Sequence, residues 1–251
     1  MEILVLLKQT FDTEAKVTVK DGRVVDDDVT LVINPYDEYA VEEALKIREA
    51  VGGTVTVLSV GPARVDEALR RALAMGADEA VAIEPPADAD EYVTASLLAA
   101  WAKDRKFDLI LAGNVSVDTG AGQTALRVAE ALGLPHVAAA LKIEIAGNTA
   151  TVHRDAEGDT EIVTVPLPAL ITAQQGLNEP RYPSVPGIMK AKRKQIARLS
   201  PADLGVDVAP KTAVTSVYQA EQNRLNKMIA GTPEEQAREL VRLLRNEAKV
   251  V

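Results

Sequence analysis

Short apolar runs alternate with longer helical patterns from Ile3 to Leu132. The runs are continuous, as is typical of strands buried on both faces of a parallel sheet, and the segments between them repeat apolar residues at helical spacing. The predicted strands are Ile3–Leu7, Thr54–Val60, Ala80–Ile83 and Leu109–Ala112, and the predicted helices are Glu38–Val51, Arg64–Met75, Asp90–Lys106 and Gln123–Leu132. Strands joined by such helices form right-handed βαβ units. The pattern therefore predicts an α/β fold with a Rossmann-like, doubly wound and mostly parallel sheet.

After Leu132 the pattern predicts a small antiparallel excursion. Its runs are separated by Gly147-Asn148 and Glu157-Gly158, which are turn-forming pairs. The predicted strands are Leu141–Ile145, Thr149–Arg154 and Glu161–Val165, followed by Ala169–Thr172 with buried-strand composition. A hairpin is also predicted near the start, where Val17–Val19 and Arg23–Val25 flank Lys20-Asp21-Gly22.

The C-terminal part has a different composition. After Leu199 the chain loses strong periodicity, and it ends in an amphipathic helix from Thr232 to about Lys249, with Thr232-Pro233-Glu234-Glu235 as N-cap and first turn. Such a helix has little to bury against in its own domain. We expect an α/β domain over residues 1–199 and a C-terminal arm over residues 200–251 that packs on a partner. The alternative is that the arm folds back onto its own domain.

Composition excludes several classes of protein. The 251 residues, 47% of them hydrophobic, suffice for a proper core. The absence of cysteine excludes disulfides, thiolate metal sites and iron–sulfur ligation, and two histidines are too few for a histidine-rich metal site, so no metal is expected. No apolar run approaches the ~18 residues of a membrane span, and Met1–Lys8 is too short for a signal peptide. These features fit a cytoplasmic protein.

Charge is unevenly distributed along the chain. The net charge of −9 makes nucleic-acid binding unexpected. However, the window from Ala173 to Leu199 carries +5, which leaves −14 for the rest. Its one acid is Glu179, and its six bases are Arg181, Lys190, Lys192, Arg193, Lys194 and Arg198. A basic segment on an acidic protein favours an acidic partner, the alternative being a solvated helix face.

A glycine-rich loop from Gly113 to Thr124 follows a buried strand and precedes a helix. Glycine lets the backbone approach a phosphate, helix N-terminal N–H groups bind it, and the hydroxyls of Ser116, Thr119 and Thr124 add donors. The loop is neither a Walker A motif nor a GxGxxG fingerprint, and it could also be a plain tight turn. Two further strand-end loops, Asn34-Pro35-Tyr36-Asp37 and Ser59-Val60-Gly61-Pro62, predict a crevice at one edge of the sheet.

Plain structural roles explain the remaining candidates. In the Asn34–Asp37 loop, Pro35 fixes a turn and Asp37 is a plausible N-cap. The acidic run Asp26-Asp27-Asp28 is expected to be a solvated turn, and His136 to be structural at a strand start. There is no Ser–His–Asp spacing, paired-carboxylate motif or metal cluster, so no catalytic residues are expected and the chain should not be an enzyme by itself.

The segment from Gly176 to Lys194 reads GLNEPRYPSVPGIMKAKRK, and it resembles the recognition loop of electron transfer flavoprotein β subunits. The resemblance extends over nearly the whole chain. It includes the opening strand with Lys8, Asn-Pro-Tyr-Asp-Glu-Tyr-Ala-Val-Glu-Glu-Ala from Asn34, Ala-Leu-Ala-Met-Gly-Ala-Asp from Ala72, and the Gly113 loop. It implies one half of a heterodimer with an electron transfer flavoprotein α subunit, an electron carrier rather than an enzyme.

The resemblance also implies cofactors. AMP would be held structurally by the β subunit, and FAD would be held mainly by the α subunit, with its ring covered near Phe11 and Thr13. Thr13 stands where other members place an aromatic residue. The positions that match AMP contacts are Leu6, Asn34, Pro35, Tyr36, Asp37, Val60, Val115, Asp118, Thr119, Gly120, Gly122, Gln123 and Thr124.

The recognition loop, residues 173–195, implies partners in fatty acid β-oxidation. It would dock acyl-CoA dehydrogenases through a hydrophobic anchor, here Val185 where better-known members have leucine, and electrons would pass to a membrane quinone oxidoreductase or another acceptor. The other expected docking residues are Arg181, Ile188, Lys190, Lys192 and Arg193. Lys190 and Arg193 match positions that are methylated lysines in some relatives. Pro180, Pro183 and Pro186 stiffen the segment, which lowers the entropy lost on docking.

Two alternatives remain open. One is a bifurcating β subunit with a second FAD in place of AMP, although such members usually carry an Arg-Gln-Ala-Ile-Asp-Gly-Asp-like loop from which Asn114–Gly120 departs. The other is a stand-alone nucleotide-binding regulator that resembles universal stress proteins.

Overall fold

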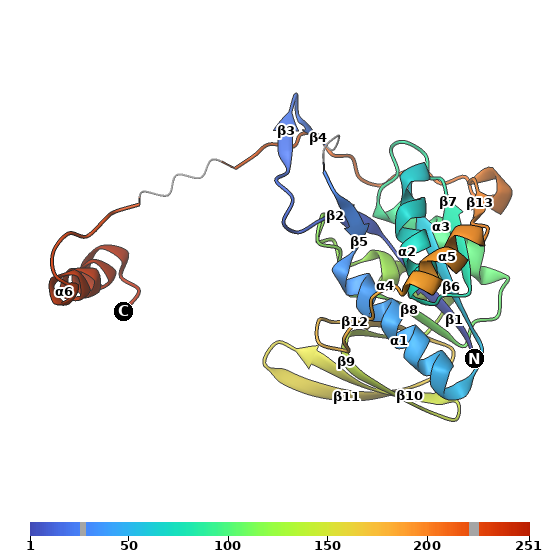
Figure 1. Ribbon diagram of the computed structural model, residues 1–251. Coiled ribbons are helices and arrows are strands. Elements are labelled where there is room, and N and C mark those ends of the chain that lie inside the picture. The colour runs from blue at the N-terminus through green and yellow to red at the C-terminus, as the bar shows by residue number, and fades with distance from the viewer. Residues whose placement is uncertain (26–28, 221–225) are drawn as a thin grey trace.

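The computed structural model describes residues 1–25, 29–220 and 226–251 (Figure 1). The acidic run Asp26–Asp28, expected to be a solvated turn, lies outside these residues. A nine-stranded sheet forms the body, in the order β11-β10-β9-β12-β8-β1-β6-β7-β13. The strands are β1 Glu2–Leu6, β6 Thr54–Val60, β7 Glu79–Ile83, β8 Leu109–Gly113, β9 His136–Ala146, β10 Thr149–Ala156, β11 Asp159–Pro166, β12 Ala169–Ala173 and β13 Ala197–Leu199.

Strand directions confirm the predicted fold class. β9, β12, β8, β1, β6, β7 and β13 pair in parallel, whereas β10 and β11 pair antiparallel at one edge. Strand β9 is longer than expected, because it begins at His136 rather than Leu141. Its first half pairs in parallel with β12 and its second half antiparallel with β10, so one strand joins the parallel sheet to the antiparallel excursion.

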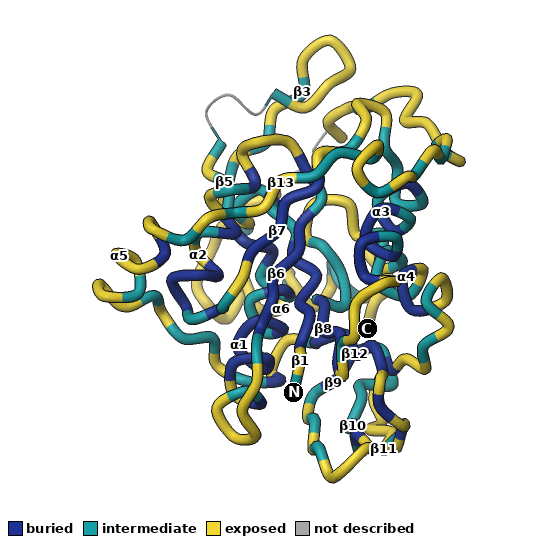
Figure 2. The backbone as a smooth tube through the Cα atoms, turned by 90° about the vertical axis from the view of Figure 1, so that its right-hand side faces the viewer, coloured by how far each residue is buried: buried dark blue, intermediate teal, exposed yellow. Residues whose placement is uncertain are grey.

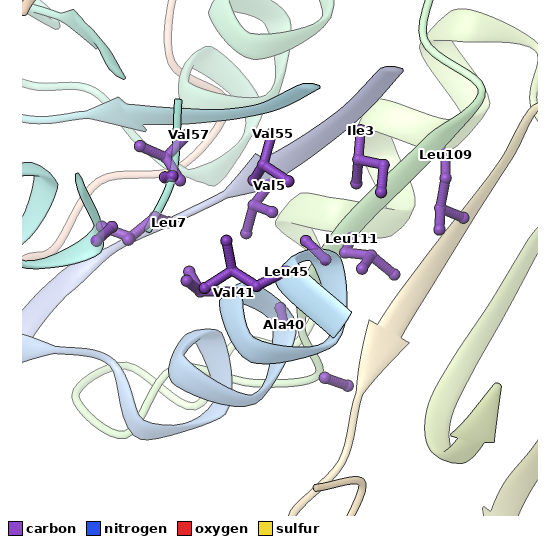
Figure 3. Close-up of a cluster of buried hydrophobic side chains, with 14 of the residues drawn as sticks. Ile3, Val5, Leu7, Ala40, Val41, Leu45, Val55, Val57, Leu109 and Leu111 are labelled. Atoms are coloured by element: carbon purple, nitrogen blue, oxygen red, sulfur yellow. The ribbon is translucent and has the colours of Figure 1, made fainter. Parts of the chain in front are cut away.

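Helices cover both faces of the sheet. Helices α1 Pro35–Val51, α2 Asp66–Met75 and α5 Val185–Arg193 contribute to one core cluster, and α3 Glu91–Lys103 and α4 Thr124–Leu132 to the other. Alternate residues of β1 face opposite ways: Ile3 and Val5 belong to the first cluster and Leu4 to the second. Figure 3 shows Val5 close to Val41 and Leu45 of α1. Covering on both faces explains why the strands are continuously apolar, and Figure 2 shows them buried.

The small elements lie beyond the carboxyl end of β1. Strands β2 Gln9–Phe11 and β5 Leu31–Ile33 pair antiparallel, and β3 Thr18–Lys20 and β4 Arg23–Val25 form the predicted hairpin. A 3₁₀ turn, η1 Ala63–Val65, precedes α2, so the helix predicted from Arg64 begins in 3₁₀ form.

The first residues of the C-terminal part pack on the body of the protein, and its last helix lies apart from it. After β13, the 3₁₀ turn η2 Ala202–Leu204 and the following residues still pack on the α3 side of the sheet through Leu204, Val206 and Val208. Helix α6 Pro233–Leu243 and the π-helical turn η3 Leu244–Ala248 lie apart from the body in Figure 1, and none of their residues is buried. The predicted N-cap is confirmed as a capping box between Thr232 and Glu235. The division at residue 199 stays a prediction.

Candidate functional site

A cavity of about 900 Å³ opens at the carboxyl ends of β1 and β8. After β1 the chain builds β6 and β7 on one side, then crosses to build β8 on the other. This reversal is a topological switch point, where doubly wound sheets bind ligands. The three strand-end loops therefore meet as predicted. The expected AMP residues that line the cavity are Leu6, Asn34, Asp37, Val60, Val115, Thr119, Gly122, Gln123 and Thr124. Pro35, Tyr36, Asp118 and Gly120 are not among its lining residues.

Asp37 joins the segment just after β1 to the end of β8 at the cavity floor. One carboxylate oxygen accepts a hydrogen bond from the Lys8 N–H at 2.7 Å and the other accepts one from the Gly113 N–H at 2.9 Å. Burial raises the pKa of this carboxyl to about 7, against the lowering effect of these hydrogen bonds. The N-cap interpretation of Asp37 is wrong: helix α1 begins at Pro35 with Asn34 as the cap position, because Pro35 takes the first helical place.

Gly113 is required where β8 meets the first turn of α1. A Cβ atom there would lie 2.2 Å from Asp37 Oδ1 and 2.7 Å from the Tyr36 Cβ. The glycine-rich loop is therefore constrained at its start by the helix behind it, which the sequence did not reveal.

The side chain of Asn34 holds the glycine-rich loop in place. Its amide donates to the Val115 carbonyl at 2.9 Å and accepts from the Val117 N–H at 3.1 Å. Asn34 is 1% exposed, so its two bonds replace those it would make with water. Asn34 and Asp37, both expected to contact a nucleotide, thus shape the site from beneath.

Lys8 and Asp118 form an ion pair at the cavity edge, with Nζ 2.8 Å from Oδ1. Burial opposes ionisation of Asp118, but the hydrogen bond and charge of Lys8 outweigh it and hold the pKa of Asp118 below its usual value. The Ser116 and Thr119 hydroxyls lie 3.0 Å apart in the same loop.

The donors and apolar groups of the cavity fit an adenine nucleotide. Thr124 and Ala125 belong to the first turn of α4, whose N–H groups have no intrahelical partners and favour a phosphate. Leu6, Val60 and Leu98 supply apolar surface for a flat ring. An apolar lining with a few polar donors is the usual composition of a small-molecule pocket.

Asp90 holds Lys211 and Thr212 of the C-terminal arm beside the cavity, a contact that sequence reasoning missed. One oxygen caps α3 through the Val93 N–H, and the other accepts from the N–H groups of Lys211 and Thr212 at 2.7 and 2.9 Å. These hydrogen bonds lower its pKa to about 2. Thr212 and Val214 also line the cavity, so the arm passes along its rim.

The predicted recognition loop, residues 173–195, contains helix α5 and is called the docking segment below. Ser184 caps α5, accepting from the Gly187 N–H at 3.1 Å. Val185 is 76% exposed, and Ile188 and Met189 are exposed beside it, whereas Ala191 is buried against the body. The expected anchor Val185 is therefore presented to solvent at the first turn of a helix.

The basic residues of the docking segment fall into two groups. Lys190, Lys192 and Arg193 are exposed. Arg181 instead pairs with Glu42 and Glu49 of α1, and Lys194 donates to the carbonyls of Ala77 and Asp78 at 2.8 Å. Beyond the segment, Arg198 pairs with Asp66.

The remaining predicted positions lie outside the cavity lining. Phe11 ends β2 and is half-buried, and Thr13 follows it on the surface. His136 opens β9, as expected, and is exposed. Within residues 1–25, 29–220 and 226–251, no cluster of three or more His, Cys, Asp or Glu side chains suited to a metal is present. In that same part of the chain, no helix has the length and apolar character needed to cross a membrane.

Comparison with known proteins decides the family. The family described as "Electron transfer flavoprotein domain" matches residues 21–204. The chain belongs to the electron transfer flavoprotein family. Its relatives are β subunits: the "Electron transfer flavoprotein subunit beta" of Bacillus subtilis is 48% identical over 100% of both chains. The β subunit of Syntrophomonas wolfei is 47% identical over 80% of this chain and 81% of its own length. The β subunit of Homo sapiens is 38% identical over 100% of this chain and 99% of its own length. The resemblance inferred from the docking segment is thereby confirmed, as a β subunit of an electron transfer flavoprotein.

Proposed function

We propose that this β subunit forms a cytoplasmic heterodimer with an electron transfer flavoprotein α subunit and binds AMP structurally in the cavity between β1 and β8. The heterodimer accepts electrons from acyl-CoA dehydrogenases and passes them to a quinone oxidoreductase or another acceptor. The observation that carries the proposal is the convergence of three strand-end loops on one cavity at the switch point of the sheet.

AMP suits the cavity through residues on opposite sides of it. The first turn of α4 and the hydroxyls of Ser116, Thr119 and Thr124 would hold the phosphate, and Leu6 and Val60 would contact the base. Asn34 and Asp37 would act from beneath, because their polar atoms are already engaged by backbone groups of this chain.

FAD supplies the electron transfer when it is bound, mainly on the α subunit. Phe11 and Thr13 of this chain would cover its ring. Leu240 and Val241 of helix α6 are 48% and 49% exposed, and these apolar side chains would pack on the α subunit. The exposed apex of the docking segment around Val185 would contact the dehydrogenase.

Nucleotide content tests the proposal. The chain is co-expressed with the α subunit of the same genome, and the purified complex is denatured and its nucleotides are quantified by chromatography. We expect one FAD and one AMP per heterodimer. Two FAD without AMP would replace the proposal by the bifurcating type, and a flavin-free homodimer would replace it by a stand-alone regulator.

A matched pair of variants links the AMP to this cavity. Asn34→Ala removes both bonds that hold the glycine-rich loop, so AMP content should fall while FAD is retained. Asn148→Ala removes a comparable amide contact to Leu167 in the antiparallel part and should keep both nucleotides. Equal AMP in both variants would place the nucleotide elsewhere.

A further inference from the structure

Arg181 is held by two carboxylates of α1. Its Nε and Nη2 donate to the two oxygens of Glu42 at 2.7 and 3.0 Å, and its Nη1 and Nη2 donate to the two oxygens of Glu49 at 2.5 and 3.1 Å. Its backbone N–H also donates to Glu42 at 3.1 Å. A guanidinium has five N–H donors, so these bonds leave one for any partner. The pKa of Arg181 is raised above its usual range, first by its bond to Glu42.

The charge around Arg181 does not favour an acidic partner. Its single positive charge faces the carboxylates of Glu42 and Glu49, and the hydrogen bond from Arg181 lowers the pKa of Glu49. The Glu42 side chain is 7% exposed, and a carboxylate that is so buried is stable only while it stays paired. The cluster of Arg181, Glu42 and Glu49 therefore has a net charge of −1, and its ion pairs act within the chain.

A second contact fixes the same stretch of chain. The side-chain amide of Asn178 donates to the Tyr39 carbonyl and to Glu43, both at 3.0 Å. Residues 178–181 thus lie along α1 through two side chains, and Leu177 before them is buried. The far end of the docking segment is held on α2, where Arg70 donates to the carbonyls of Ala191 and Lys194 at 2.5 Å.

We infer that Arg181 and Glu42 are positioning residues, which fix the docking segment on α1, and that the dehydrogenase is met instead by Val185, Ile188 and the exposed bases Lys190, Lys192 and Arg193. This assignment rests on the proposed docking function, and it takes Arg181 out of the contact surface where the family resemblance would place it. A partner would then bind the exposed part of the docking segment around Val185, whose conformation is already fixed at both ends. This lowers the entropy lost on association.

The two possible roles of Arg181 predict opposite effects for Glu42→Gln. If Arg181 touched an acidic partner, removing the charge of Glu42 would free it and strengthen docking. If the ion pair positions the segment, the same change weakens docking, because the charge-assisted bonds to Arg181 are lost and the apex loses its fixed place. The variant is nearly isosteric, so packing is preserved.

The test uses the complete heterodimer with its flavin bound. The rate of flavin reduction is measured by stopped flow against the concentration of a substrate-reduced acyl-CoA dehydrogenase of the same organism, at several salt concentrations. Glu42→Gln and Arg181→Gln should each raise the half-saturating dehydrogenase concentration by about tenfold, the equivalent of one lost charge-assisted bond. The double variant should be no worse than Arg181→Gln alone, since both remove one interaction.

Salt dependence separates positioning from contact. Lys190→Gln should reduce the salt dependence of docking, because it removes a charge that faces the partner. Glu42→Gln and Arg181→Gln should leave that dependence unchanged, and amide exchange of residues 177–193 should become faster in both without any dehydrogenase. Arg198→Gln, which breaks a comparable pair with Asp66 outside the docking segment, is the matched control and should dock normally.

Two outcomes overturn the inference in different ways. Stronger or unchanged docking by Glu42→Gln, with weaker and less salt-dependent docking by Arg181→Gln, would make Arg181 a contact residue while the docking function stands. If Val185→Ala and Lys190→Gln also leave flavin reduction unaltered, the docking function itself is wrong, and the inference falls with it. Retained FAD in every variant shows that the heterodimer is intact.

Discussion

Gly113→Ala tests whether close contact between β8 and α1 builds the cavity that we propose holds AMP. The new Cβ would lie 2.2 Å from Asp37 Oδ1, 2.7 Å from the Tyr36 Cβ and 2.9 Å from the Asp37 backbone nitrogen. Two of these atoms belong to the rigid first turn of the helix and cannot rotate away. The helix must therefore separate from the strand by about 1 Å, which also breaks the 2.9 Å bond from the Gly113 N–H to Asp37.

The magnitude follows from these two effects. Overpacking a well-packed site costs about 1–3 kcal/mol, and losing a hydrogen bond to a charged group costs about 1.5–3 kcal/mol. We expect a loss of about 3–5 kcal/mol in the free energy of unfolding, or about 6–20 °C in melting temperature for a chain of this size. Bound AMP should fall as well, since the same strand end forms the cavity floor.

Thermal unfolding followed by circular dichroism measures the effect, with nucleotide content as a second readout. The matched control is Gly133→Ala at the end of α4, where φ is 65° and no atom lies within 4 Å of the new Cβ. It should cost only the left-handed strain of about 1 kcal/mol and should retain AMP. If Gly113→Ala is no less stable than Gly133→Ala, the close-contact reasoning is refuted.

Two further predictions concern Asp37 and the arm. The Asp37 carboxyl keeps its proton to about pH 7 in the folded state but loses it near pH 3.8 when unfolded, so the folded state binds the extra proton between these values and stability falls as pH rises. Relative to Asp37→Asn, the wild type should lose about 4 kcal/mol in denaturant unfolding from pH 4 to pH 8, and parallel profiles would contradict the shift. Deleting residues 226–251 should abolish co-purification with the α subunit. The melting temperature of the body should stay within about 2 °C of the wild-type value, because no residue of α6 is buried. A large drop in melting temperature would show that the arm packs on its own domain.

Local features of the sequence predicted the elements that depend on neighbouring residues. Continuous apolar runs between helical patterns predicted the parallel sheet, because strands covered on both faces have no polar side. The N-cap at Thr232 and the exposed Val185 among prolines were also evident, since caps and turns are determined within about four residues. The family resemblance likewise came from short, specific runs.

Only the tertiary structure decided which of the candidate site residues line the cavity and which bind other parts of the chain. Asp37 and Gly113 are 76 residues apart and Arg181 and Glu42 are 139 apart, so no local pattern pairs them. Asp37 was expected to cap a helix and instead accepts hydrogen bonds from the backbone just after β1 and at the end of β8. Arg181, expected to dock a partner, forms ion pairs with Glu42 and Glu49 of α1, and its docking role stays a prediction. A charged side chain pairs with whichever opposite charge or polar group the fold places next to it. The distance in space between residues that are far apart along the chain cannot be read from a single sequence.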